Sequence, residues 1–201
     1  FDRITRPEQI ISSLQQAIQV MLDPADCGPA CISLSQDVQG EVFDYPEEFF
    51  KERIHTIRRP KPDDFQIKEA AELIKKSKKP IIIAGGGVFY SDATEELSSF
   101  ASKHNIPVTQ TVMGYSSIKK DHSHYLGTIG GLGGKAANNL SKETDTAIAI
   151  GTKLADFTTG SWANFENADF KLVSINAARF DANKHMAQAV VGDAKVSLSE
   201  L

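Results

Sequence analysis

Residues 79–88 read Lys-Pro-Ile-Ile-Ile-Ala-Gly-Gly-Gly-Val, an apolar β-branched run closed by three glycines. The run has the length and composition of a strand that is buried on both faces of a parallel sheet. Gly85, Gly86 and Gly87 are expected to form the turn after it, with positive φ angles and backbone amides that face an anion or a neighbouring strand. An amphipathic helix is expected over 92–104. The stretch therefore predicts a βαβ unit of a Rossmann-like domain.

These glycines do not by themselves establish a nucleotide site. The dinucleotide fingerprint G-x-G-x-x-G/A is met at Gly85 and Gly87, but its third position is Tyr90. The bulk of a tyrosine opposes the close packing of helix on strand that the third glycine permits. The pattern therefore favours a structural turn over a nucleotide-binding one.

Composition restricts the class of protein. The 201 residues are 41% apolar and 24% charged, which is typical of a soluble globular protein. A net charge of −4 argues against nucleic acid as a partner. No apolar run approaches the roughly 20 residues that cross a bilayer, and no signal peptide is visible, so we expect no membrane association and a cytoplasmic location.

Two cysteines, Cys27 and Cys31, lie four residues apart in a segment that we expect to be extended. In a strand this spacing is too long for a disulfide, and no further ligands for zinc stand nearby. Both are expected to be reduced, buried thiols.

The chain divides into three stretches. Residues 1–45 hold one expected helix (7–22) and one strand (29–34), too little to bury both faces without a partner, which is either upstream chain or another copy. Residues 46–63 carry three prolines and suit a linker. In residues 64–201 the expected helices are 64–77, 92–104, 134–141 and 179–184, and the expected strands are 80–84, 107–111, 145–151, 171–176 and 188–191. This alternation predicts an α/β fold, a parallel sheet flanked by helices.

Because Phe1 is not an initiator residue and the last residues resemble a helix barely begun, we expect a fragment of a larger polypeptide.

Two further motifs resemble ligand-binding segments. Gly127–Gly134 resembles a phosphate-binding loop, but Ile129 and Ala136 stand where that motif needs Gly and Ser or Thr, and no strand is expected before it. A tight helix entry is the favoured interpretation.

The second motif, Gly151–Asp156, follows a strand at the edge where open α/β sheets bind ligands. Lys153 is a candidate for a phosphate and Asp156 for a ribose hydroxyl, although both also suit a surface. Asn176 follows the next strand, where an acidic ribose-binding group is expected, and it is neutral.

No catalytic set is evident. His122 and His124 lack a third ligand at a recognisable spacing, and no nucleophile lies in a recognised elbow or in a Ser/His/Asp or Cys/His arrangement. We predict no catalytic residue and no metal ligand in this chain.

Four motifs together resemble a known family. They are Lys-Lys-Pro-Ile-Ile-Ile-Ala-Gly-Gly-Gly (78–87), Leu-Gly-Thr-Ile-Gly-Gly-Leu-Gly-Gly (126–134), Thr-Asp-Thr-Ala-Ile-Ala-Ile-Gly-Thr-Lys-Leu-Ala-Asp (144–156) and Val-Val-Gly-Asp-Ala-Lys (190–195). With them the chain resembles thiamine diphosphate (ThDP)-dependent enzymes of the acetohydroxyacid synthase and benzoylformate decarboxylase type. The resemblance implies that residues 64–201 are the central Rossmann-like domain and residues 1–45 the end of the pyrimidine-binding domain.

Residues 2–9 and 36–50 are similar to the branch of that family that hydrolytically opens the ring of an inositol-derived cyclic diketone. The resemblance implies a parent hydrolase that acts on a C–C bond with ThDP and Mg²⁺, and a fragment that is structural and inactive alone. The family's activating glutamate is not in this chain, and Gly192-Asp193 is followed by Ala194, so the Gly-Asp-Gly magnesium motif is not met either. The implied partners are the other domains of the polypeptide and further copies in a dimer or tetramer.

Some relatives bind FAD or ADP in the central domain through Gly-x-Arg-Phe, where this chain has Gly151-Thr152-Lys153-Leu154. Lysine lacks the planar fork of arginine, which weakens the case for a flavin. The candidate cofactor residues are therefore Gly85, Gly86, Gly87, Lys153 and Asp156, in a nucleotide pocket that we expect to be vestigial. Three alternatives stay open: a nucleotide module for FAD, ADP or NAD, the central domain of an acetolactate synthase-like carboligase, and a plain interaction domain.

Overall fold

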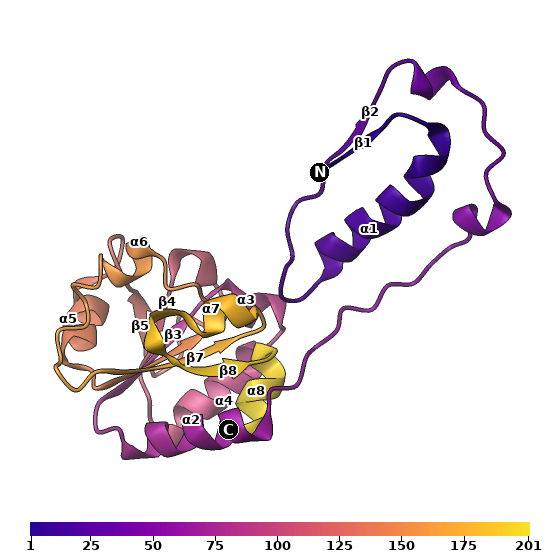
Figure 1. Cartoon of the computed structure of the whole chain (residues 1–201). Helices are drawn as coiled ribbons and strands as arrows, with labels where there is room; N and C mark the ends of the chain where they lie inside the picture. Colours follow the sequence, from indigo (N-terminus) through magenta and orange to yellow (C-terminus); the bar gives the residue numbers. More distant parts are fainter. The chain divides into compact units, whose positions relative to one another are not determined.

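The computed structural model describes all 201 residues and divides the chain into two compact units, Phe1–Arg58 and Arg59–Leu201 (Figure 1). No helix in it combines the length and the apolar character needed to cross a membrane. The two units are described separately.

The smaller unit contains a two-stranded parallel sheet and one long helix. Strand β1 (Asp2–Ile4) pairs with β2 (Ile32–Leu34), and they are connected through a 3₁₀ turn (Pro7–Gln9) and α1 (Ile10–Leu22). Two further 3₁₀ turns follow, at Val38–Gly40 and Glu47–Phe50. Only Ile4 and Val38 are buried aliphatic side chains, so this unit has almost no hydrophobic core of its own.

The expectation that Cys27 and Cys31 are buried is wrong. Both thiols are free and exposed. The reason is that the expected strand begins only at Ile32, so that both cysteines lie in the turn and coil that connect α1 to β2.

The larger unit is a six-stranded parallel sheet in the order β5-β4-β3-β6-β7-β8. The strands are β3 (Pro80–Ala84), β4 (Val108–Gln110), β5 (Tyr125–Thr128), β6 (Thr146–Ile150), β7 (Lys171–Asn176) and β8 (Gln188–Val191). The helices are α2 (Asp64–Lys76), α3 (Gly86–Tyr90), α4 (Thr94–His104), α5 (Lys135–Glu143), α6 (Asp156–Thr159), α7 (Arg179–Ala182) and α8 (Ala194–Glu200), with 3₁₀ turns at Val112–Gly114 and Lys184–Met186. The predicted α/β fold with a parallel sheet is confirmed.

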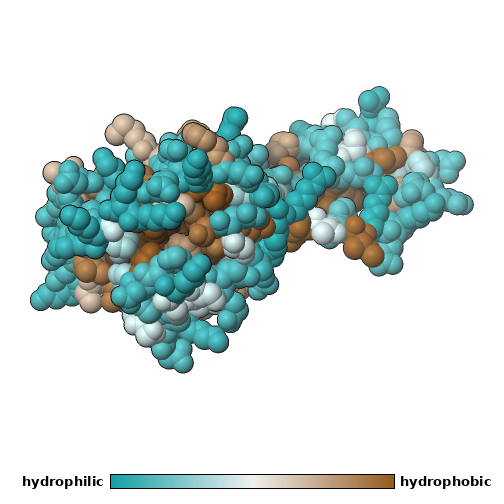
Figure 2. Space-filling model, turned by 90° about the horizontal axis from the view of Figure 1, so that it is seen from below, coloured by the Kyte–Doolittle hydropathy of each residue, from teal (hydrophilic) through white to brown (hydrophobic).

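Helices cover both faces of this sheet. Figure 1 shows α2, α4 and α8 together on one face, where Ala70, Phe100 and Leu198 pack against alternate strand residues such as Ile82. On the other face α5 covers a second core that contains Ile81 and Ile83. The four residues of β3 after Pro80 are thus buried, as the apolar run predicted. Viewed from the α2 side, hydrophilic residues cover most of the larger unit, and apolar residues show between them (Figure 2).

The prediction that no strand precedes the glycine-rich segment 127–134 is wrong, because β5 runs into it. This strand lies at the edge of the sheet, is only half-buried and contains Gly127, so it lacks the continuous apolar pattern of the inner strands.

Candidate functional site

The strand order reverses between β3 and β6, and ligands of open α/β sheets bind beyond the carboxyl ends of the strands at such a point. Gly85 follows β3 and Gly151 follows β6. The two segments hydrogen-bond directly: the amide of Gly85 donates to the Ile150 carbonyl at 2.8 Å, and that of Gly87 donates to the Gly151 carbonyl at 2.9 Å. Two of the three amides expected to face an anion are therefore already occupied.

The glycines are required here for a close approach of two backbones. A Cβ on Gly85 would lie 2.3 Å from the Gly151 carbonyl oxygen, and one on Gly87 would lie 2.6 Å from the Gly151 Cα. The expected turn with positive φ at 85–87 is wrong: Gly85 has φ −103°, and Gly86 begins α3. The residue with positive φ at this crossing is Gly151, at +60°.

Lys153 and Asp156 lie at the same edge, on the connection that follows β6. Both side chains are exposed, and the buried Leu154, with φ +48°, stands between them. Neither side chain forms one of the ion pairs or hydrogen bonds of the structure. The structure thus brings all five predicted cofactor residues to one edge, but with a direct backbone contact where a nucleotide phosphate would need space.

Asn176, the last residue of β7, hydrogen-bonds both to the segment that follows β6 and to the segment that follows β7 itself. Its side-chain amide donates to the Thr152 carbonyl at 3.2 Å, and its oxygen accepts from the Ala178 amide at 3.0 Å. A carboxylate at this position has no proton to donate to Thr152, which explains why a neutral amide suits the site.

The glycine-rich segment 127–134 forms a tight entry to α5. Its amides find partners inside the fold: Gly130 donates to the Asn138 side chain at 2.9 Å and Gly131 to the Phe157 carbonyl at 2.8 Å. Gly127 and Gly130 have φ of +95° and +94°, a conformation that glycine adopts without strain. The segment therefore shapes the edge of the sheet and leaves few donors for a phosphate.

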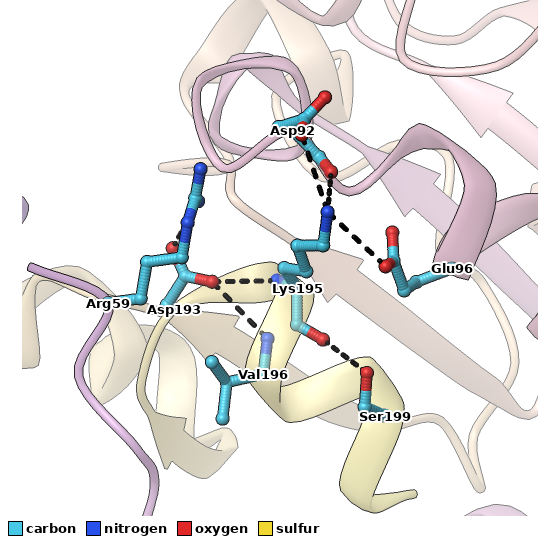
Figure 3. Close-up of polar contacts among 7 residues, drawn as sticks. All are labelled: Arg59, Asp92, Glu96, Asp193, Lys195, Val196 and Ser199. Atoms are coloured by element: carbon cyan, nitrogen blue, oxygen red, sulfur yellow. Dashed lines mark hydrogen bonds and ion pairs between the residues drawn. The ribbon is translucent and has the colours of Figure 1, made fainter. Parts of the chain in front are cut away.

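The residues of this chain do not provide the ligand atoms that ThDP and Mg²⁺ need. No group of three His, Cys, Asp or Glu side chains converges on a possible metal position. Asp193 of the Gly-Asp-Ala motif is buried, accepts from the amides of Lys195 (3.0 Å) and Val196 (3.2 Å), and pairs with Arg59 at 3.2 Å (Figure 3). Its carboxylate caps α8 and is already paired with the Arg59 guanidinium, so it is not available to a metal ion.

A feature that the sequence motifs did not reveal is a set of exposed apolar side chains in the segments after the carboxyl ends of the strands. We call it the carboxyl-edge set. It comprises Phe89, Tyr90, Val112, Met113, Tyr115, Leu132, Phe157 and Phe180, each at least half exposed. Its members lie in the segments that follow β3, β4, β5, β6 and β7, and because parallel strands end at one edge, these segments begin at the same edge of the sheet. A contiguous exposed apolar patch is typical of an interaction site.

Comparison with known proteins defines the class. The family model described as thiamine pyrophosphate enzyme, central domain, matches residues 67–201. The chain therefore belongs to the thiamine pyrophosphate enzyme family, as its motifs indicated, and the residues that match the central-domain model lie in its larger unit.

Individual relatives are similar to the chain along its whole length. Over all 201 residues the chain is 47% identical to the 3D-(3,5/4)-trihydroxycyclohexane-1,2-dione hydrolase of Clostridium perfringens (strain 13 / Type A) and 48% identical to that of Clostridium botulinum (strain Alaska E43 / Type E3). It covers 32% and 31% of these proteins, so the chain spans about a third of the length of the curated relatives it matches.

Solved structures show the same fold. The benzoylformate decarboxylase of Polynucleobacter necessarius superposes with a TM-score of 0.76 at 20% identity, over 98% of this chain and 36% of that one. A putative thiamin diphosphate-dependent enzyme of Mycobacterium smegmatis gives a TM-score of 0.73 at 21% identity, over 98% of this chain and 37% of that one.

Proposed function

We propose that this chain is the central segment of a ThDP-dependent hydrolase that opens the ring of a trihydroxycyclohexane-1,2-dione. The observation that carries the proposal is 47% identity to a hydrolase of that name along the whole chain, including the first 66 residues that the family model does not cover. ThDP and Mg²⁺ would be held by other parts of the protein, because the residues here do not fit them.

The proposed reaction has a simple balance. Hydrolysis of the bond between the two carbonyl carbons adds OH to one carbon, which becomes a carboxylic acid, and H to the other, which becomes an aldehyde. One water molecule is consumed and no redox partner is needed. ThDP supplies the carbanion chemistry when it is bound. The product is an open-chain acid that keeps its hydroxyl groups.

The contribution of this segment is structural. The carboxyl-edge set is an apolar surface against which the ThDP- and Mg²⁺-binding parts of the longer protein would pack. In the smaller unit, β1 and β2 form a sheet too small to be stable alone, which supports its assignment to a pyrimidine-binding domain completed by other chain. We propose the division 1–45, linker 46–63 and central domain 64–201, in a cytoplasmic homo-oligomer.

A segment exchange tests the proposed activity. The matching third of the Clostridium perfringens hydrolase is replaced by this chain, and ring opening of the dione is measured with ThDP and Mg²⁺. We expect a kcat/KM within about tenfold of the unmodified relative. The control is the same relative carrying the corresponding segment of an acetolactate synthase.

A chimera that assembles but joins two pyruvate molecules instead of opening the dione would support the carboligase alternative and contradict the proposal. FAD or ADP in this segment is not supported, because the backbone contact between Gly85–Gly87 and Gly151 fills the expected phosphate position.

A further inference from the structure

Two histidines to which the sequence motifs gave no role lie side by side between α4 and β5. His122 and His124 are half-buried in the connection that enters β5, with their ring centres 5.5 Å apart. The Nε2 atom of His122 lies 3.2 Å from the Ser102 hydroxyl oxygen, and that of His124 lies 2.8 Å from the Asn105 side-chain oxygen. Ser102 is in the last turn of α4, and Asn105 is its C-cap. We call these four residues the histidine clasp, and we propose that it fastens β5 to α4 at neutral pH and opens as the pH falls.

The hydrogen bonds determine where each imidazole carries its proton. The backbone amide of His124 donates to Nδ1 of His122 at 3.2 Å. Because a backbone amide can only donate, this Nδ1 carries a lone pair, and the proton of His122 is on Nε2, which donates to the Ser102 hydroxyl. In His124, Nε2 donates to the Asn105 oxygen, and Nδ1 accepts from the Ser123 hydroxyl at 3.0 Å. Both rings in the closed clasp are therefore neutral, with the proton on Nε2.

An added proton affects the two rings differently, because a protonated imidazole donates from both nitrogens. The Ser123 hydroxyl can turn and accept from a protonated Nδ1 of His124, so this ring keeps both of its hydrogen bonds. The amide that faces Nδ1 of His122 cannot accept, so a proton on this atom meets a second donor and the bond is lost. His122 is therefore the acid-sensitive half of the clasp.

The other titratable groups in this part of the unit do not hydrogen-bond to the clasp. No ion pair or hydrogen bond joins either imidazole to a charged side chain. His104, on the same turn of α4, packs on the Phe100 ring, and burial lowers its pKa, with a smaller effect of Lys103. The remaining titratable neighbours in the connection, on α4 and on β5 are Lys119 with its partner Glu95, Lys120, Asp121 and Tyr125.

The strand β5 depends on this fastening more than the inner strands would. It lies at the edge of the sheet with β4 as its one neighbour, it is half-buried, and its register to β4 is irregular. Its first residues are held through the clasp segment: the Val108 amide donates to the His124 carbonyl at 2.8 Å, and the Tyr125 amide donates to the His122 carbonyl at 3.0 Å. An open clasp therefore loosens the start of β5 before any inner strand. The clasp belongs to the fold of the larger unit and is independent of the proposed reaction.

The first experiment locates the imidazole protons by ¹⁵N NMR of the 201-residue chain at about pH 7.5, where most histidine side chains are neutral. We expect the proton of His122 and that of His124 on Nε2. A proton on Nδ1 of His122 would overturn the proposal, because this atom could then not accept from the His124 amide.

The second experiment follows amide exchange with solvent at about pH 7.5 and about pH 5.5, corrected for the intrinsic effect of pH on exchange. We expect the protection of the His124 and Tyr125 amides to fall about fivefold at the lower pH, the equivalent of one lost hydrogen bond. The amides of β3 should keep their protection.

Variants separate the acceptor from the charge. In His122→Asn the side-chain oxygen can accept in place of Nδ1 and takes up no proton, so protection should be kept at both pH values. His122→Phe keeps a ring without an acceptor, and protection should be low at both pH values. His104→Gln is the matched control: it removes the other histidine of this turn and should leave the acid response of wild type unchanged.

Thermal unfolding at the higher pH confirms that each variant is folded. The proposal is overturned if wild type shows no acid response, if folded His122→Asn still shows it, or if folded His122→Phe is protected like wild type. It is equally overturned if His104→Gln abolishes the response, or if the amides of β3 lose protection together with those of His124 and Tyr125.

Discussion

At the scale of single residues, the crossing of Gly85 and Gly87 with Gly151 determines what the carboxyl edge can do. A nucleotide phosphate would need the amides of Gly85 and Gly87. These amides already donate to the carbonyls of Ile150, the last residue of β6, and of Gly151. The same contact leaves no room for a side chain on either glycine. The crossing fixes the connections after β3 and β6 to each other, and so it provides a rigid base for the carboxyl-edge set.

The glycine crossing gives the first prediction. Gly85→Ala places a Cβ 2.3 Å from the Gly151 oxygen, so the backbone must shift, and we expect a loss of about 3 kcal/mol in the free energy of unfolding. Gly134→Ala is the matched control, because its Cβ meets nothing within 4 Å and its φ is −73°. It should cost at most about 1 kcal/mol, since alanine is the weaker N-cap. Equal losses in urea unfolding would contradict the close approach.

Asp145 gives the second prediction, on pH. Burial of its carboxylate raises the pKa, but hydrogen bonds from the Ser77 hydroxyl and the amides of Lys78 (2.8 Å) and Lys79 (3.2 Å) outweigh this, and the pKa lies below the usual 3.8. A lowered folded-state pKa stabilises the protein above pH 3.8, and the contribution is lost as the pH falls through the folded pKa. Asp145→Asn should therefore cost about 1–2 kcal/mol at pH 7.

The test for Asp145 is urea unfolding of both proteins between pH 7 and pH 3. The difference in unfolding free energy between wild type and Asp145→Asn should be constant down to about pH 5 and then shrink. A difference that stays constant to pH 3 would show that ionisation of Asp145 has no part in it.

At the scale of elements, α8 is tied to two other parts of the larger unit by residues 193–195 (Figure 3). Asp193 caps the helix and pairs with Arg59, and its amide donates to the Pro60 carbonyl at 2.8 Å. Lys195 pairs with Asp92 at 3.3 Å and Glu96 at 3.5 Å. The Gly-Asp-Ala motif therefore anchors the chain that enters the larger unit, and this gives a structural reason for an aspartate outside any magnesium site.

The third prediction concerns this anchor. Asp193→Ala removes two capping hydrogen bonds and the partner of Arg59, and should cost about 2–3 kcal/mol of unfolding free energy. Asp193→Ser can still cap the helix and should lose less. Asp63→Ala is the control, because the Asp63 carboxylate caps α2 by accepting one hydrogen bond from the Phe65 amide and forms no ion pair. If Asp193→Ala and Asp63→Ala cost the same in urea unfolding, the Arg59 pair contributes nothing.

Five of the six strands of the larger unit could be predicted from the sequence, to within one residue at each end. The bounds of β3, β7 and β8 agree with the expected ones, and β4 and β6 are each one residue shorter at both ends than expected. Apolar runs such as the one in β3 identify strands with two covered faces. The strand β5 and the short helix α3 were missed, since the first is half-buried with a glycine and the second begins with Gly86-Gly87. The position of the site followed from parallel-sheet geometry. The backbone contact at Gly151 and the contacts of His122 and His124 with α4 depend on tertiary packing, which sequence patterns do not report.

At the scale of the whole molecule, the two units differ in how much core they hold. The larger unit has a covered core on each face of its sheet, whereas the smaller one buries only Ile4 and Val38 among its aliphatic side chains. The relatives are about three times as long as this chain.

The fourth prediction follows from this contrast. A shortened chain of residues 59–201 should keep the unfolding free energy of the full chain to within about 1 kcal/mol, because Arg59 retains its pair with Asp193. In the full chain, amides of residues 1–58 should exchange with solvent much faster than those of β3 and β6. A shortened chain that fails to fold would show that the smaller unit is needed for the larger one.

The central claim is that this segment serves its protein through an apolar contact surface and not through a catalytic group. Methionine oxidation tests it directly, because Met113 belongs to the carboxyl-edge set and is 77% exposed in this chain. With peroxide and mass spectrometry, we predict that Met113 oxidises readily in the chain alone and about tenfold more slowly in the exchange chimera. Met186, which is fully exposed and precedes β8, is the reference in the chain alone for the oxidation rate of a solvent-exposed methionine. Equal oxidation of Met113 in both proteins would contradict the claim.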